Sequence, residues 1–210
     1  MSELFSIQLQ NRQQQGGDGV WLDLPTTTEQ VQAALRQIGI SSDNPQGLFI
    51  SGYFAEEEKR FAISYNMVLA SNVDELNFLA SRLETLSTGE RAELNAALQA
   101  PQSELFSIGR ITDFPENVDY YVHLPDVHGP AQLGDYYLNR SGMVDMPEEW
   151  KGGIDTAQFG RYVAQQEQGV FTQYGYLVKS GDEWQKVHEG QPVPEEYRVL
   201  SFPAPEVLRD

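Results

Sequence analysis

The sequence predicts an α+β protein built from three small domains, at residues 1–70, 71–116 and 117–210. Strand patterns bounded by glycine and proline occur in the first and the last of these segments, which indicates small antiparallel sheets. Two helical patterns with capping sequences lie between them within about thirty residues, as is typical of a pair of packed helices. Of the 210 residues 40% are hydrophobic, which is enough apolar material to form cores.

The N-terminal domain is predicted to be a small antiparallel sheet with one helix. Thr26 followed by Glu29 forms a capping box that opens the helix, and Gly39 can end it in the left-handed conformation. Pro25 stops the strand before the helix because proline cannot donate to a ladder of hydrogen bonds. The predicted strands are Ser2–Leu9, Val20–Leu24, Gly47–Phe54 and Arg60–Tyr65, the last two separated by an acidic turn at Glu56–Glu58.

The central domain is predicted to be helical. Asn72 with Glu75, and Ser87 with Glu90, are two pairs at the spacing of a helix N-cap and its third residue. Each pair is followed by leucine and alanine residues at helical spacing. The pattern therefore predicts two helices that pack as a hairpin.

The hexapeptide SELFSI occurs twice, at Ser2–Ile7 and at Ser103–Ile108. The first copy lies in an alternating pattern and is predicted to be a strand. The second copy is followed by Ile111 at three-residue spacing and is predicted to be a short helix capped by Ser103. Context outranks intrinsic propensity over six residues, so the match does not indicate a duplicated domain.

The C-terminal domain is predicted to be an α+β unit that ends in a β-hairpin. Pro130 opens one helix and Asp155 caps another. The pattern of Asn117–Leu124 fits a strand or a helix. From Gly190 on, four prolines without periodicity predict a tail that is ordered at its start and frayed toward its end. The hairpin is predicted from Val170–Lys179 and Trp184–Val187, which flank a turn at Ser180–Asp182.

The chain is strongly acidic, with 31 Asp and Glu against 14 Lys and Arg and a net charge of −17. Residues 71–150 hold 14 of the acidic and 4 of the basic side chains. Nucleic-acid binding is disfavoured, because phosphate neutralisation needs a stripe of Lys and Arg. No apolar stretch approaches the roughly 18–20 residues that span a bilayer. With no export signal and no cysteine, we expect a cytoplasmic protein that binds neither nucleic acid nor membrane.

The sequence gives little support for an enzyme. His123 and His128 bracket Asp126, and this grouping resembles a metal site. However, Pro125 and Gly129 break the helical spacing of the two histidines, and no further ligand stands at a diagnostic spacing. A turn with two surface histidines is the preferred interpretation. The sequence also has no phosphate-binding glycine loop and no nucleophile motif beside a base. We therefore expect no catalytic residues, no metal and no cofactor.

Aromatic residues of the C-terminal domain are expected to form a core or an oligomer interface, since they dominate both. We expect a homodimer, in which an apolar patch overcomes the repulsion between two acidic chains. The candidate interface residues are Tyr120, Tyr121, Tyr136, Tyr137, Phe159 and Tyr162.

Several motifs, in their order along residues 15–177, resemble the ArdA family of antirestriction proteins. The first is Gly19-x-Trp21-x-x-Leu24-Pro25, and the second is Asp74-Glu75-Leu76-Asn77 followed by Leu79 and Leu83. The third comprises Asp135-Tyr136-Tyr137, Gly142, Pro147, Ile154-Asp155, Phe159-Gly160-Arg161, Gly169-x-Phe171 and Gly175.

This resemblance implies an elongated, acidic, dimeric protein of three small domains. It further implies a protein that mimics the bend and charge of DNA and occupies the DNA groove of a type I restriction–modification enzyme or its methyltransferase core. Carboxylates three or four residues apart on a helix have Cβ atoms roughly 5–6 Å apart, so they can form a row of phosphate-like charges. The predicted partner-binding carboxylates are Asp74, Glu75, Glu84, Glu90, Glu93, Glu104, Asp113, Glu116, Asp119 and Asp126.

Other functions remain open from the residues. The same acidic surface could block a CRISPR effector or a DNA-binding repressor. A metal-dependent hydrolase would use the histidine turn and nearby carboxylates. An acidic scaffold subunit would need neither a groove-binding surface nor a metal site.

Overall fold

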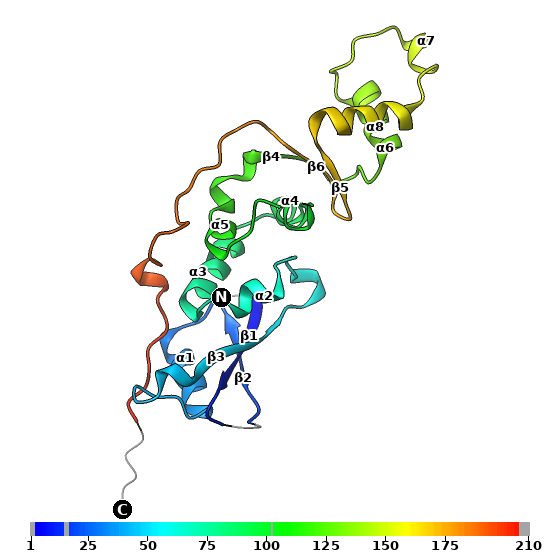
Figure 1. Ribbon diagram of the computed structural model, residues 1–210. Coiled ribbons are helices and arrows are strands. Elements are labelled where there is room, and N and C mark those ends of the chain that lie inside the picture. Colours follow the sequence, from blue (N-terminus) through cyan, green and yellow to red (C-terminus); the bar gives the residue numbers. More distant parts are fainter. Residues whose placement is uncertain (1–2, 15–16, 102, 206–210) are drawn as a thin grey trace, which may run out of the picture. The chain divides into compact units, whose positions relative to one another are not determined.

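The computed structural model describes residues 3–14, 17–101 and 103–205 and has a mixed α+β fold (Figure 1). The chain divides into two compact units, each with one three-stranded antiparallel sheet. Unit 1 comprises Met1–Leu86, Phe106–Pro115 and Lys186–Asp210, and unit 2 comprises Ser87–Leu105 and Glu116–Gln185. The predicted fold class is confirmed, whereas the division into three domains stays a prediction.

The sheet of unit 1 consists of β1 (Phe5–Asn11), β2 (Val20–Leu24) and β3 (Leu48–Phe54) in the order β2-β1-β3. A shift in register between Gln8 and Leu9 interrupts the pairing of β1 with β3. Alternate residues of the strands are buried on the inner face, and α1 (Thr28–Gln37) packs against β2. The fully or almost fully buried side chains here include Phe5, Ile7, Leu9, Leu22, Leu24, Val31 and Leu35.

The start of α1 differs by one residue from the prediction. Thr27, and not Thr26, is the N-cap, and its capping box is completed by Gln30. Thr26 is instead buried, and its backbone N–H donates to the side-chain oxygen of Asn77 at 2.8 Å. Gly39 lies just beyond the helix with a φ of 65°, as predicted.

The predicted strand at Arg60–Tyr65 is wrong. This segment is irregular and leads into α2 (Tyr65–Leu69), after a 3-10 turn at Glu57–Lys59. Phe61 and Ile63 are buried, with exposed fractions of 2% and 6%. The alternation that predicted a strand is therefore real, but it reflects the packing of an irregular segment onto the core.

Two capping boxes in the central part of the chain are confirmed. Asn72 and Glu75 open α3 (Val73–Glu84) in unit 1, and Ser87 and Glu90 open α4 (Thr88–Gln99) in unit 2. In both boxes the N-cap side chain accepts from the third helical N–H, and the glutamate carboxylate accepts from the N-cap N–H. Each device satisfies two N–H groups that the helix leaves unpaired.

The two SELFSI copies differ in structure, as predicted. Residues 5–7 of the first copy belong to β1. The second copy is mostly irregular, so the helix predicted for it is wrong: α5 begins only at its last residue and spans Ile108–Thr112. Ser107 is the N-cap of α5, and the Ser103 side chain instead accepts a hydrogen bond from the backbone of Leu105.

The sheet of unit 2 consists of β4 (Tyr121–Leu124), β5 (Val170–Thr172) and β6 (Gly175–Lys179) in the order β4-β6-β5. The hairpin lies between β5 and β6, so the predicted turn at Ser180–Asp182 is wrong. Gln185 lies outside any strand because its backbone N–H and C=O both bond to the Asn117 side chain, at 2.7 and 3.0 Å.

The helices of unit 2 pack closely through two glycines. The unit contains α6 (Pro130–Asp135), which continues into a π-helical turn at Tyr136–Arg140, then α7 (Glu148–Lys151) and α8 (Thr156–Glu167). A Cβ atom on Gly134 would lie 1.9 Å from the Thr156 carbonyl oxygen, and one on Gly160 would lie 1.8 Å from that of Pro130. Only glycine permits this approach of α6 and α8.

The C-terminal segment belongs to unit 1, where side chains of α3 bind its backbone. The Asp74 carboxylate accepts from the backbone N–H groups of Val199 and Leu200, each at 2.7 Å. The Asn77 side chain donates to the Tyr197 carbonyl at 3.0 Å. A short 3-10 helix forms at Glu195–Tyr197. Side chains of α3 thus supply the backbone partners that this proline-rich segment cannot find in a sheet.

Candidate functional site

The ten predicted partner-binding carboxylates are divided between the two units. Four belong to unit 1: Asp74, Glu75, Glu84 and Asp113. Six belong to unit 2: Glu90, Glu93, Glu104, Glu116, Asp119 and Asp126. Their local surroundings separate them into carboxylates that hold the backbone, carboxylates that cap helices, and carboxylates that face solvent.

Two of the ten carboxylates hold the C-terminal segment in place. Asp113 has no exposed surface and accepts from the N–H groups of Val187, His188 and Glu189 at 3.3, 2.6 and 3.2 Å. Asp74 is half-buried and binds two further N–H groups of the same segment. The Asp113 carboxylate therefore contributes no charge to the surface, and the Asp74 carboxylate contributes little.

Glu104 is neutralised by a neighbour. Its carboxylate accepts from Lys179 Nζ and from the Tyr120 hydroxyl, both at 2.6 Å. The same hydrogen bond raises the pKa of Lys179 above its usual value, which favours the paired state. This arrangement joins the segment before α5 to β6 within unit 2, and it offers no free anion to a partner.

The capping glutamates remain charged at the surface. Hydrogen bonds from the Ser87 side chain and backbone lower the pKa of Glu90 below its ordinary value. Glu75 makes the equivalent bond to the Asn72 N–H, at 3.3 Å. Both side chains are only partly buried. The position of Glu90 at a helix N-terminus also favours its anionic form.

Glu90, Glu93 and Asp119 form an electrostatically coupled group in unit 2. Burial of Glu93, followed by repulsion from Glu90 and then from Asp119, raises the pKa of the Glu93 carboxyl to about 8. Its Oε1 atom is buried, and it has no hydrogen-bond partner within the part of the chain that the structure describes. Burial is thus the main reason that Glu93 is largely protonated at neutral pH, and the two neighbouring carboxylates add to the shift.

The other predicted partner-binding carboxylates are more accessible to solvent. Glu116, Asp119 and Asp126 are exposed, and Glu84 is half-buried. Sequence reasoning did not include the acidic turn at Glu56–Glu58, whose three side chains are all exposed. The run of three carboxylates was the signal that could have marked this second anionic site.

Most of the predicted dimer-interface aromatics belong to the core of unit 2. Tyr121 is buried, and Tyr136 and Tyr137 pack against a cluster that includes Leu133 and Tyr176. The hydroxyls of Tyr137 and Tyr176 both donate to Glu167, at 2.5 and 2.9 Å, and burial raises the pKa of each tyrosine. Tyr120 and Phe159 are half-buried.

Large exposed apolar side chains of unit 2 lie around α7 and α8. Tyr162, the only one of the six candidates with an exposed side chain, is 60% exposed, and Met143 and Trp150 are 74% and 68% exposed. Met143 and Trp150 were not among the predicted interface residues. These three side chains are the more accessible candidates for an apolar contact with a second molecule.

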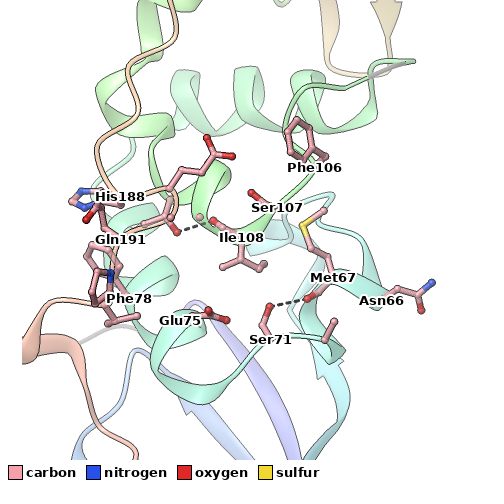
Figure 2. Close-up of a pocket in the computed structure, with 17 residues that line it drawn as sticks. Asn66, Met67, Ser71, Glu75, Phe78, Phe106, Ser107, Ile108, His188 and Gln191 are labelled. Carbon is pink, nitrogen blue, oxygen red and sulfur yellow. Dashed lines mark hydrogen bonds between the residues drawn. The ribbon is translucent and has the colours of Figure 1, made fainter.

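A cavity of about 830 Å³ lies in unit 1, between α2, α3, α5 and the segment that begins at His188. Figure 2 shows that the side chains of Met67, Phe78, Ile108 and Glu75 border it. Its hydroxyl groups serve the local backbone: Ser71 Oγ donates to the Met67 carbonyl, for example, at 2.8 Å. The cavity therefore lacks a hydroxyl nucleophile activated by a base among these groups.

The histidine turn also lacks the geometry of a metal centre. His123 Nε2 lies 2.7 Å from the Tyr174 carbonyl oxygen, so this ring nitrogen is engaged by the backbone. Asp126 and His128 are exposed. Across the described ranges, no group of three or more His, Asp or Glu side chains is placed to hold a metal ion.

Comparison with known proteins identifies the family. The model of the family described as "Antirestriction protein (ArdA)" matches residues 17–178. No curated protein matches the chain. Within the described residues, no helix is long and apolar enough to cross a membrane. ArdA is a family of antirestriction proteins, which act on restriction enzymes, and it is not known as a family of enzymes. Because the match covers well over half of the sequence, this chain belongs to the ArdA antirestriction protein family.

Proposed function

We propose that this ArdA protein inhibits a type I restriction–modification enzyme by occupying its DNA-binding groove as a mimic of DNA. The observation that carries the proposal is the coupled acidic group of Glu90, Glu93 and Asp119, together with the exposed carboxylates of Glu116 and Asp126 in the same unit.

B-DNA presents one negative charge per about 1.7 Å of helix axis, counting both strands. A protein that imitates it must keep carboxylates close together despite their repulsion, and Glu90 and Glu93 are one turn apart on α4. Burial is the main cause of the raised pKa of Glu93, and repulsion from Glu90 and Asp119 adds to it. Lysines and arginines of a DNA groove would relieve that repulsion on binding, as they do for phosphates.

The enzyme's methyltransferase core is the proposed partner, because it carries the DNA groove that such a surface would fill. A CRISPR effector or a DNA-binding repressor offers similar basic grooves, so these remain alternative targets of the same surface. A metal-dependent hydrolase is less well supported, since His123 is engaged by a backbone carbonyl. We also propose that the protein acts as a homodimer, for which the exposed Tyr162, Met143 and Trp150 provide apolar surface.

Competition with DNA tests the proposal. A fluorescent DNA duplex containing the recognition site is bound to a type I methyltransferase core, and the anisotropy is followed as the ArdA protein is added. The protein should displace the duplex completely, and its apparent affinity should fall as the duplex concentration rises. Inhibition that is unaffected by DNA concentration would exclude occupation of the groove. Loss of inhibition in EDTA would favour the hydrolase instead.

A further inference from the structure

The outer face of the unit 1 sheet carries a feature that the acidic surface of unit 2 does not explain. Trp21 on β2 and Phe54 at the end of β3 are 49% and 54% exposed, although both are large aromatic side chains on a small sheet. Their rings meet edge to face with centroids 6.4 Å apart. Trp21 belongs to the Gly-x-Trp motif of the sequence, to which the proposed mimicry gives no role.

Strand register places these rings in two adjacent rows. One row across β2, β1 and β3 consists of Asp23, Ser6 and Phe54. The next row consists of Trp21, Gln8 and Gly52. A Cβ atom on Gly52 would lie 3.0 Å from the Trp21 ring. The missing side chain therefore leaves room for the indole to lie across the sheet toward Phe54.

Two carboxylates converge beside the aromatic pair. Ser6 Oγ lies 2.9 Å from Asp23 Oδ1 and 3.2 Å from Glu3 Oε1. A hydroxyl has one hydrogen to donate, so it can satisfy only one of these carboxylates at a time. Both acidic residues are exposed, and neither forms an ion pair with a Lys or Arg in the described part of the chain.

Further acidic side chains follow Phe54 directly. Glu56, Glu57 and Glu58 are exposed, and Lys59 pairs with the first of them at 3.3 Å. The aromatic pair is thus bordered by carboxylates on its own face of the sheet and at the end of β3. A guanidinium group fits both parts of this surface, because it stacks on aromatic rings and donates paired N–H bonds to carboxylates.

We propose that Glu3, Trp21, Asp23 and Phe54 form an arginine-binding surface on unit 1 that contacts an arginine-bearing segment of the inhibited enzyme. The identity of the enzyme rests on the proposed function, whereas the preference for arginine rests on this surface alone. An arginine side chain would stack against the exposed ring of Trp21 or Phe54 and donate to the Asp23 and Glu3 carboxylates. The guanidinium group would supply hydrogen-bond donors to both carboxylates, whereas the Ser6 hydroxyl can donate to only one of them at a time.

A peptide titration tests the surface without any restriction enzyme. The full-length chain, labelled with ¹⁵N, is titrated with a hexa-arginine peptide while the indole N–H resonances are followed; Trp21→Phe assigns the Trp21 signal. The Trp21 resonance should shift saturably, and hexa-lysine should bind several-fold more weakly because lysine lacks the planar fork. An unshifted Trp21 resonance, or equal binding of the two peptides, would overturn the proposal.

Substitutions then connect the surface to inhibition. Asp23→Asn combined with Glu3→Gln should weaken peptide binding several-fold without removing core side chains, and Trp21→Ala with Phe54→Ala should weaken peptide binding and inhibition about tenfold. Phe106→Ala, which removes an exposed aromatic ring elsewhere in unit 1, is the matched control and should leave peptide binding unchanged. Circular dichroism melting confirms that each variant is folded.

The outcomes separate the two proposals. If the native chain inhibits the enzyme and the folded Trp21/Phe54 variant inhibits it equally well, the arginine-binding surface is wrong while DNA mimicry stands. If that aromatic variant misfolds, the Asp23/Glu3 variant decides the same question. If arginine peptide binds at Trp21 and the native chain does not compete with DNA, the surface stands and the proposed function fails.

Discussion

Glu90 and Glu93 lie one turn apart on α4, and burial of Glu93, with added repulsion from Glu90, raises the pKa of Glu93 to about 8. The folded state therefore holds a proton on Glu93 at a pH where the unfolded chain, with an ordinary carboxyl pKa near 4.5, has lost it. Folding stability must fall as the pH rises from about 4.5 to about 8 through this residue. This loss of folding stability arises at Glu93, which lies within the proposed DNA-mimicking surface.

Replacing Glu93 by Gln should remove that pH dependence. At pH 8.5 the variant should be more stable than the native chain by the order of 1 kcal/mol, since partial solvent exposure screens the full shift. At pH 4.5 the two should have nearly equal free energies of unfolding. Urea denaturation at both values measures this, with Glu183→Gln, an exposed carboxylate of the same unit, as control. A constant difference across pH would show that Glu93 is not protonated in the folded state.

Asp113→Ala should destabilise unit 1 strongly. The substitution leaves three backbone N–H groups near residues 187–189 without their acceptor, which costs about 2–4 kcal/mol. The exposed Glu116→Gln is a control expected to change stability by less than about 0.5 kcal/mol. Urea unfolding provides the free energies. If Asp113→Ala keeps native stability and still loses inhibition, Asp113 contacts the partner directly and its structural assignment is wrong.

Gly160→Ala should separate α6 from α8. The added methyl would lie 1.8 Å from the Pro130 carbonyl oxygen, a backbone atom that cannot move aside without shifting α6. We expect a loss of about 1–3 kcal/mol in the free energy of unfolding. Gly152→Ala is the matched control, because nothing lies within 4 Å of its Cβ position. Equal thermal melting curves for the two variants would contradict the close packing.

The proposed homodimer should tighten with salt. Two chains of net charge −17 repel each other, and added salt screens this repulsion while leaving an apolar contact intact. Light scattering at micromolar concentration should report a larger dimer fraction at 0.5 M than at 0.05 M sodium chloride. Tyr162→Ser combined with Trp150→Ser should shift the equilibrium toward monomer. A monomer at every salt concentration would rule the dimer out.

Short sequence motifs were sufficient to predict many of the helices and strands. The capping boxes at Asn72 and Ser87 are complete within four residues, so the sequence predicted both helix starts correctly. The helix expected from Ser103 failed because Ser103 and Ser107 are both plausible caps, and tertiary packing of α5 on α3 selects the second. Likewise, the strand expected at Trp184–Val187 failed because Asn117, distant in sequence, takes the backbone hydrogen bonds of Gln185.

The candidate site was harder to predict than the fold. Composition located the acidic part of the chain, but it did not distinguish Asp113, which is buried among backbone N–H groups, from Asp119, which is exposed. Both are aspartates in short irregular or 3-10 segments, and only the position of the C-terminal segment separates them. The sequence likewise cannot show that Glu104 binds Lys179, or that Asp74 and Asp113 bind backbone N–H groups of residues 187–200, because these partners are distant along the chain. All three were therefore predicted as partner-binding carboxylates.

Neutralising four surface carboxylates of the proposed binding surface on unit 2 tests DNA mimicry most directly. The variant carries Glu90→Gln, Glu116→Gln, Asp119→Asn and Asp126→Asn; its control carries Asp145→Asn, Glu148→Gln, Glu149→Gln and Glu183→Gln, four exposed residues of the same unit outside the proposed surface. Both lose the same charge, and displacement of DNA from the methyltransferase core is measured for each at low and at high salt.

Each carboxylate should contribute of the order of 0.5 kcal/mol, so the site variant should displace DNA at least tenfold less well than the native chain at low salt. The control should lose less than about threefold, and high salt should reduce the difference. Equal losses for the two variants would show that only total charge matters, and full activity of the site variant would contradict mimicry by this surface.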